Sequence, residues 1–177
     1  MLNAESTLLV VIDVQEKLAG VMLDSEFIIE NLQKMIKGAR LLGIPLLVTE
    51  QVNLGPTIAK IADTTEGVTP IVKSSFSCCG EESFMNALEK SARKQIILGG
   101  IECHICIYQT AVDLAALGYE TQVLADCVSS RTFLNRKIGL DRMKSEGVRL
   151  TSTEMALFEL LKVAEGEKIR SLSKLVK

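Results

Sequence analysis

The stretch I-I-L-G-G-I-E-C-H-I-C-I-Y-Q-T, residues 96–110, joins the end of an apolar run to a segment of helical periodicity. Residues 95–98 form a short apolar run, which predicts a buried strand that ends at the glycine pair after it. A helix is expected over residues 104–117. Since strands that lead directly into helices are typical of βαβ units, this stretch predicts a parallel sheet covered by helices.

The same alternation of strand and helix patterns runs along the chain. Further strands are expected over residues 8–12, 45–50, 69–73, 120–125 and 148–151. Further helices are expected over residues 25–42, 57–62, 81–92, 133–145 and 153–163. Ser25 is the expected N-cap of the first helix, in which Phe27 belongs to the apolar positions. The predicted fold is α/β, with a mostly parallel sheet between two layers of helices.

Reactive or polar side chains follow four of the expected strands. Asp13 ends the first, Glu50 and Gln51 end the second, Lys73 ends the third, and residues 99–106 follow the fourth. In open α/β sheets, ligands bind beyond the carboxyl ends of the strands. We therefore expect these groups to converge.

Composition limits the class of protein. The chain has 177 residues, of which 47% are hydrophobic and 24% are charged, which suits one domain spanning residues 1–177. The net charge of −2 and a pI near 5.6 argue against a nucleic-acid partner, which would need a concentrated basic face. No segment reaches the roughly 20 apolar residues that cross a bilayer, so no membrane partner is expected.

The N-terminus and the cysteines point to the cytoplasm. The N-terminal apolar run ends at Asp13 and lacks the basic region of a signal peptide. Five cysteines at irregular spacing suggest free thiols in a reducing compartment. The tail, residues 166–177, carries apolar residues at three-residue intervals and is expected to dock on the body or on another subunit.

The C-H-I-C motif at residues 103–106 admits three interpretations. A zinc site is disfavoured because the chain has one histidine and no second C-x-x-C. A redox pair would follow the first strand rather than a late one. In the third, Cys106 lies in the first turn of a helix, where the helix dipole lowers the thiol pKa and favours a nucleophilic thiolate. A plain buried thiol is as well supported by the residues alone.

Four segments together resemble the isochorismatase-like cysteine hydrolase superfamily, and especially its isochorismatase domain-containing proteins. They are L-L-V-V-I-D-V-Q (8–15), P-I-V-K-S-S-F-S (70–77), I-I-L-G-G-I-E-C-H-I-C-I-Y-Q-T-A-V-D-L (96–114) and L-A-D-C-V-S-S-R (124–131). The resemblance implies a doubly wound, Rossmann-like fold with an Asp-Lys-Cys catalytic set: Asp13, Lys73 and Cys106. The family pattern places the nucleophile six positions after Gly100, which makes Cys103 a bystander.

The resemblance also implies details around the nucleophile. A cis peptide bond is expected between Ile101 and Glu102, and the backbone N–H groups of Glu102 and Cys106 would form an oxyanion hole. Phe76 is expected as a pocket wall or as plain core. Gln51 is expected to contact substrate or to order its loop. Nicotinamidases of the superfamily bind metal through Asp and His residues in the loop after the second strand, and neither type occurs there, so no metal or cofactor is expected.

These residues lead to one expected function and two alternatives. The expected function is hydrolysis of a small amide or related C–N substrate through a thioester, in a protein that forms homo-oligomers. The alternatives are vinyl-ether hydrolysis of an isochorismate-like compound and a catalytically silent binding or scaffold protein. His104 is expected to bond locally, and residues 129–131 to brace the structure. The remaining cysteines, Cys78, Cys79 and Cys127, are expected to be buried or incidental.

Overall fold

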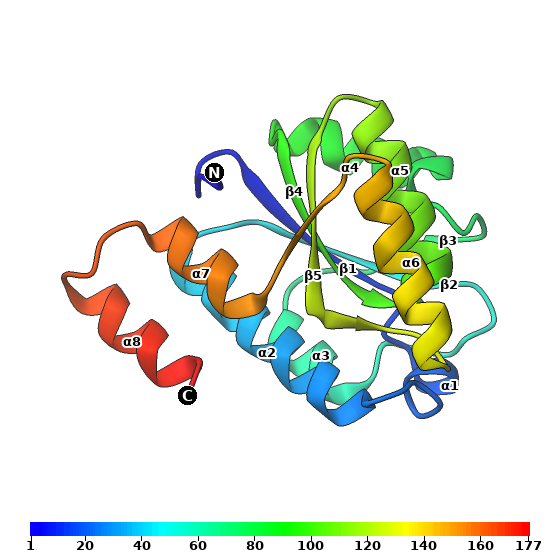
Figure 1. Ribbon diagram of the computed structural model, residues 1–177, viewed down its shortest axis with the longest axis horizontal. Helices are drawn as coiled ribbons and strands as arrows, with labels where there is room; N and C mark the ends of the chain where they lie inside the picture. Colours follow the sequence, from blue (N-terminus) through cyan, green and yellow to red (C-terminus); the bar gives the residue numbers. More distant parts are fainter.

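The computed structural model describes residues 1–177 and contains one six-stranded sheet between two layers of helices (Figure 1). The strands are β1 (Thr7–Ile12), β2 (Leu46–Gln51), β3 (Ile71–Lys73), β4 (Gln95–Ile101), β5 (Glu120–Ser129) and β6 (Arg149–Thr151). The helices are α1 (Glu16–Ala19), α2 (Ser25–Leu42), α3 (Ala59–Ala62), α4 (Glu82–Ser91), α5 (Tyr108–Ala116), α6 (Phe133–Ser145), α7 (Thr153–Leu161) and α8 (Glu167–Leu175).

All strands are parallel and lie in the order β3-β2-β1-β4-β5-β6. The direction in which the chain adds strands reverses between β1 and β4. This is the doubly wound arrangement, in which the crevice at the reversal point is the usual ligand site. The predicted fold class is confirmed.

The two faces of the sheet bury separate apolar clusters. Leu9 and Val11 of β1 pack with α2, α3, α7 and α8, whereas Leu8 and Val10 pack with α4, α5 and α6. Every residue of β1 is buried, because helices cover both faces and the period of a strand is two residues. Near the C-terminus, Leu172 of α8 is fully buried in the first cluster. None of the helices combines the length and the apolar character needed to span a membrane.

A close approach between β1 and β4 brings two segments of the expected site together. Gly100 has a φ of 130°, and a Cβ atom there would lie 2.0 Å from the carbonyl oxygen of Ile12. Only glycine combines this φ with this contact. The turn after β4 therefore begins directly beside Asp13.

Several local details differ from the sequence-based expectations. Helix α1 was not expected, because four residues show no periodicity, and Asp24 rather than Ser25 is the N-cap of α2. Phe27 does not face the core, since it is 56% exposed. The helix expected over residues 104–117 is instead a π-helical turn, Cys103–Ile107, followed by α5. Strand β5 extends four residues further than expected.

Candidate active site

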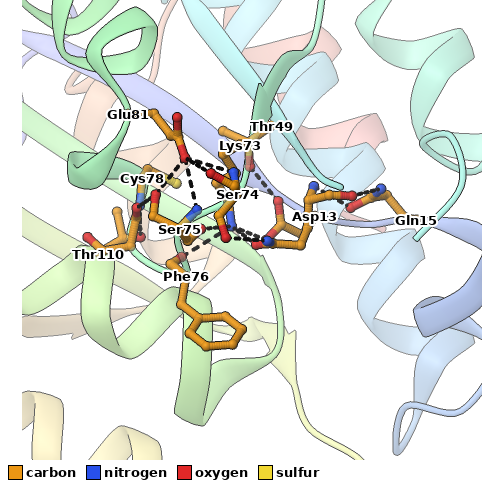
Figure 2. Close-up of polar contacts among 12 residues, drawn as sticks. Asp13, Gln15, Thr49, Lys73, Ser74, Ser75, Phe76, Cys78, Glu81 and Thr110 are labelled. Carbon is orange, nitrogen blue, oxygen red and sulfur yellow. Dashed lines mark hydrogen bonds and ion pairs between the residues drawn. The ribbon is translucent and has the colours of Figure 1, made fainter. Parts of the chain in front are cut away.

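Asp13 lies at the carboxyl end of β1, where the chain leaves the sheet. Its backbone adopts a left-handed conformation with a φ of 54°, which aspartate tolerates better than most residues. The carboxylate is 1% exposed, and its Oδ1 accepts a hydrogen bond of 2.7 Å from Thr49 Oγ1 on the neighbouring strand β2. Thr49 therefore fixes the plane of the carboxylate (Figure 2).

Lys73 lies at the carboxyl end of β3, two strands away from Asp13. Its Nζ is 2.7 Å from Asp13 Oδ2, and both side chains are 1% exposed. The ammonium also donates to Gln51 Oε1 at 2.6 Å and to the carbonyl oxygens of Ser75 and Phe76 at 3.1 Å. These contacts offset part of the free energy that burying a charged group costs. Because Asp13 Oδ2 accepts no hydrogen bond beyond this ion pair, it has a lone pair available for a proton.

Glu81 holds the loop that provides the carbonyl groups for Lys73. Its Oε1 accepts hydrogen bonds from the backbone N–H and hydroxyl groups of both Ser74 and Ser75, at 2.7 to 3.1 Å (Figure 2). These bonds, with the Ser75 backbone N–H first, lower the pKa of Glu81 to about 2. Sequence analysis missed this residue, since a glutamate at the start of a helix carries no distinctive signal.

Removing the Glu81 carboxylate is expected to impair the site without removing any reacting group. Glu81→Ala should lower kcat about tenfold, because Lys73 loses the ordered carbonyls that position it. Glu81→Gln keeps an oxygen acceptor and should retain most of the activity at neutral pH. A pKa lowered in the folded state gives stability that is present above pH 4.5 and lost as the pH falls towards 2. The melting temperature should therefore depend less on pH over that range in Glu81→Gln than in the wild type. The same pH dependence in both proteins would contradict this role.

Gln15 is a second positioning residue that sequence analysis did not single out. Its amide nitrogen donates to the carbonyl oxygens of Gln51 and Gly55, and its Oε1 accepts from the Gln51 backbone N–H at 2.8 Å. It ties the end of β1 to the end of β2 and to the loop after it. The I-D-V-Q motif contained the signal, because Gln15 lies two residues after Asp13.

Cys106 lies in the π-helical turn and is 7% exposed. Its pKa is raised to about 12: burial is the largest cause, the negative charge of Asp13 also raises the pKa, and Lys73 acts in the opposite direction. The expectation of a resting thiolate is therefore wrong. Desolvation and a neighbouring carboxylate outweigh the helix terminus, so the resting sulfur is a neutral thiol.

The raised pKa predicts how Cys106 reacts with an alkylating agent. The rate of labelling by iodoacetamide should rise about tenfold for each pH unit from 7 to 10, because only the thiolate reacts and its population grows at that rate below the pKa. Peptide mapping of Cys106 against time measures this, with cysteine in a short blocked peptide as the control thiol that levels off above about pH 9. A plateau at Cys106 below pH 9 would show that the site stabilises the thiolate after all.

A cavity of about 380 Å³ opens above these residues. It lies at the reversal point of the sheet, and the loop after β2 forms one wall. The lining residues are mostly apolar: Asp13, Leu18, Gln51, Val52, Asn53, Leu54, Phe76, Ile101, Glu102, Ile105 and Cys106. The volume and character suit a small organic molecule. Lys73 does not line the cavity. Its ammonium pairs with the carboxylate of Asp13, which does.

Glu102 lines the cavity together with Cys106. The peptide bond between Ile101 and Glu102 is cis. The Glu102 carbonyl oxygen accepts from the N–H groups of Ile105 and Ile107, which closes the π-helical turn. Its carboxylate accepts from the backbone N–H and Nε of Arg131, both at 3.2 Å. Arg131 thereby braces the turn that carries Cys106.

The other residues considered from the sequence lie around this site without lining the cavity. His104 Nδ1 is 2.9 Å from Ser130 Oγ, and Ser129 donates to the Leu23 carbonyl. Glu50 turns away, because its carboxylate accepts from the backbone N–H and hydroxyl of Thr57. Cys78, Cys103 and Cys127 are buried and Cys79 is partly buried, all as free thiols. No group of three or more His, Cys, Asp or Glu side chains is arranged to hold a metal.

The doubly wound sheet with a Cys-Asp-Lys cluster at its reversal point defines an α/β protein of the isochorismatase-like hydrolase type. The isochorismatase domain model matches residues 7–155. The chain is 35% identical over 178 residues to the secreted isochorismatase effector Isc1 of Phytophthora sojae, covering 97% of this chain and 85% of that protein. It is 33% identical to isochorismatase domain-containing protein 2 of Danio rerio, covering 99% and 89%. The structure of the MAR1 ribonuclease of Caenorhabditis elegans superposes with a TM-score of 0.92 at 32% identity, covering 99% and 91%. The chain belongs to the isochorismatase family.

Proposed function

We propose that the protein is a cysteine hydrolase that cleaves a small amide or a related C–N substrate through a thioester. The observation that carries this proposal is the buried Asp13 carboxylate at the floor of the cavity. Its Oδ2 forms an ion pair with the Lys73 ammonium and has no further hydrogen bond, and Cys106 lines the same cavity. A nucleophile beside a base that a third group orients is the arrangement of covalent hydrolases.

The first half of the reaction forms the thioester. Because the thiol is neutral at rest, its proton passes to Asp13 as the sulfur attacks the carbonyl carbon. Charge builds on the carbonyl oxygen, where the backbone N–H groups of Glu102 and Cys106 would stabilise it. Asp13 then returns the proton to the leaving nitrogen, the C–N bond breaks, and the amine or ammonia departs.

The second half releases the acid. Asp13, again unprotonated, takes a proton from a water molecule that attacks the thioester carbon. The C–S bond breaks and the proton returns to Cys106. Lys73 holds the Asp13 carboxylate in place throughout and limits the accumulation of charge when Asp13 exchanges protons. Since the three groups are coupled, the apparent pKa values in the pH profile of the reaction describe the three groups together rather than one residue.

A panel of amide and carbamoyl substrates tests the proposal. Wild type and Cys106→Ala are assayed for release of ammonia or amine. Turnover that only the wild type shows supports the proposal, and mass spectrometry of the quenched enzyme should detect an acyl adduct on Cys106. Equal rates for the two proteins across the panel would contradict it. That result would favour the alternative of a catalytically silent binding or scaffold protein.

The other activities considered have less support. The vinyl-ether reaction is typical of relatives that lack the cysteine, whereas this cavity includes Cys106. Ribonuclease is the name that the worm relative carries, and it describes that protein. The composition of this chain, with a net charge of −2, does not favour binding a polyanion. We further propose that residues 1–177 act as one domain, that residues 166–177 serve its docking or assembly, and that the protein works as a cytoplasmic homo-oligomer on a small molecule.

A further inference from the structure

We propose that the cavity selects uncharged amides with an apolar acyl group and discriminates against amides that carry a carboxylate. This inference rests on the proposed hydrolase function and adds the substrate class to it. The charges of the cavity lining, and the positions of the nearest cations, carry the argument.

The lining of the cavity combines apolar side chains with acidic ones. Seven of its eleven residues are hydrophobic, and both charged members, Asp13 and Glu102, are acids. Neither lysine, arginine nor histidine belongs to the lining. A substrate carboxylate bound here would lose its hydration and would face negative rather than positive groups.

The basic side chains around the cavity are already engaged. Lys73 is 1% exposed, and its ammonium donates to Asp13, to Gln51 and to two carbonyl oxygens. Arg131 bonds the Glu102 carboxylate through Nε. Lys17 donates to the carbonyl oxygen of Asn53 from the outer side of the loop. None of these cations belongs to the cavity lining, so a carboxylate bound there has no cation among the residues that surround it.

The lining contains two side-chain amides, Gln51 and Asn53, and the first of them is engaged. Gln51 accepts from Lys73 through Oε1 and donates to the carbonyl oxygen of Ser74 through Nε2. The surface left for the acyl group is aliphatic and aromatic, and Phe76, which is 56% exposed, supplies the largest ring. In Figure 2 this ring projects away from the polar cluster around Lys73. An apolar acyl group gains contact with these walls, whereas a charged group gains nothing.

Alkylation of Cys106 tests the charge selection without any need for a known substrate. Iodoacetamide and iodoacetate are similar in size and differ in charge. We expect the rate with iodoacetamide divided by the rate with iodoacetate to be at least tenfold larger at Cys106 than at N-acetylcysteine. Val52→Lys, which adds an ammonium at the exposed rim of the cavity, should reduce this excess about tenfold, whereas Val52→Met should not. An excess below threefold in the wild type, or no response to Val52→Lys, overturns the proposal.

Turnover of a matched series separates this proposal from the hydrolase function. Hexanamide, adipamide and adipamate share one carbon chain and end in a methyl group, a second amide and a carboxylate. The expected order of kcat/KM is hexanamide, then adipamide, then adipamate, with at least a tenfold loss at the last step. Equal Cys106-dependent turnover of adipamide and adipamate would overturn the substrate class and leave the hydrolase standing. If no amide shows Cys106-dependent turnover, the hydrolase is overturned, and the substrate class falls with it.

Discussion

Asp13→Asn is expected to lower kcat by about a thousandfold and, at the same time, to speed the alkylation of Cys106. The loss of turnover follows because asparagine cannot accept the thiol proton or return it to the leaving nitrogen, and such proton transfers contribute about 10² to 10⁴ in rate. The faster alkylation follows because the charge of Asp13 raises the pKa of Cys106, so that removing this charge increases the thiolate population. Few structural defects would move the two measurements in opposite directions.

The control for this prediction is Thr49→Val. It removes the hydrogen bond to Asp13 Oδ1 but keeps the carboxylate, so kcat should fall much less than in Asp13→Asn. Steady-state kinetics on the best substrate of the panel and peptide mapping after iodoacetamide treatment provide the two measurements. If alkylation slows in parallel with turnover in Asp13→Asn, the charge of Asp13 does not hold back formation of the thiolate, and this prediction is contradicted.

Lys73→Met is expected to lower the free energy of unfolding by about 3–5 kcal/mol, since it leaves the Asp13 carboxylate buried without its counter-ion. Both members of the pair are 1% exposed and 2.7 Å apart, so water cannot replace the ammonium without opening the structure. The fraction of Lys73→Met that folds should also be alkylated more slowly at Cys106 than the wild type, because Lys73 lowers the pKa of that thiol. Urea unfolding followed by circular dichroism measures the stability change.

The chain offers a matched control for this substitution. Lys137 and Asp141 form an ion pair on the surface of α6, with both side chains more than half exposed. Lys137→Met should cost less than about 0.5 kcal/mol, because solvent screens an exposed pair. The double variant Asp13→Asn/Lys73→Met should be less destabilised than the sum of its single variants. If Lys73→Met lowers the free energy of unfolding no more than Lys137→Met does, the buried pair is not a structural requirement.

Much of the fold could be predicted from the sequence because its pattern is local. The continuous apolar run of β1 predicted a strand covered on both faces, and the helical spacing of α2 gave that helix its bounds. Helix α1 and the π-helical turn could not be predicted. The first is too short to show a period, and the second is a rare local departure from the α-helix that residue propensity does not encode.

The candidate site divides in the same way. The residue types at the strand ends predicted that Asp13, Lys73 and residues 99–106 would converge, since parallel strands bring their carboxyl ends to one edge of the sheet. The family resemblance then singled out Asp13, Lys73 and Cys106. Glu81 and Gln15 were missed because their roles consist of hydrogen bonds to segments distant in the sequence or to backbone groups. Such bonds have no periodicity and no motif of their own.

The sequence by itself determined which elements form and which reactive side chains end them, because both depend on the order of residues along the chain. Only the tertiary structure decided the protonation state of Cys106 and the charge of the cavity. Both depend on burial and on which charges lie close together in space. Asp13 and Lys73 are 60 positions apart in the chain, yet β1 and β3 place their charged atoms in contact. A helix terminus suggested a thiolate, whereas desolvation and the neighbouring carboxylate keep the thiol neutral.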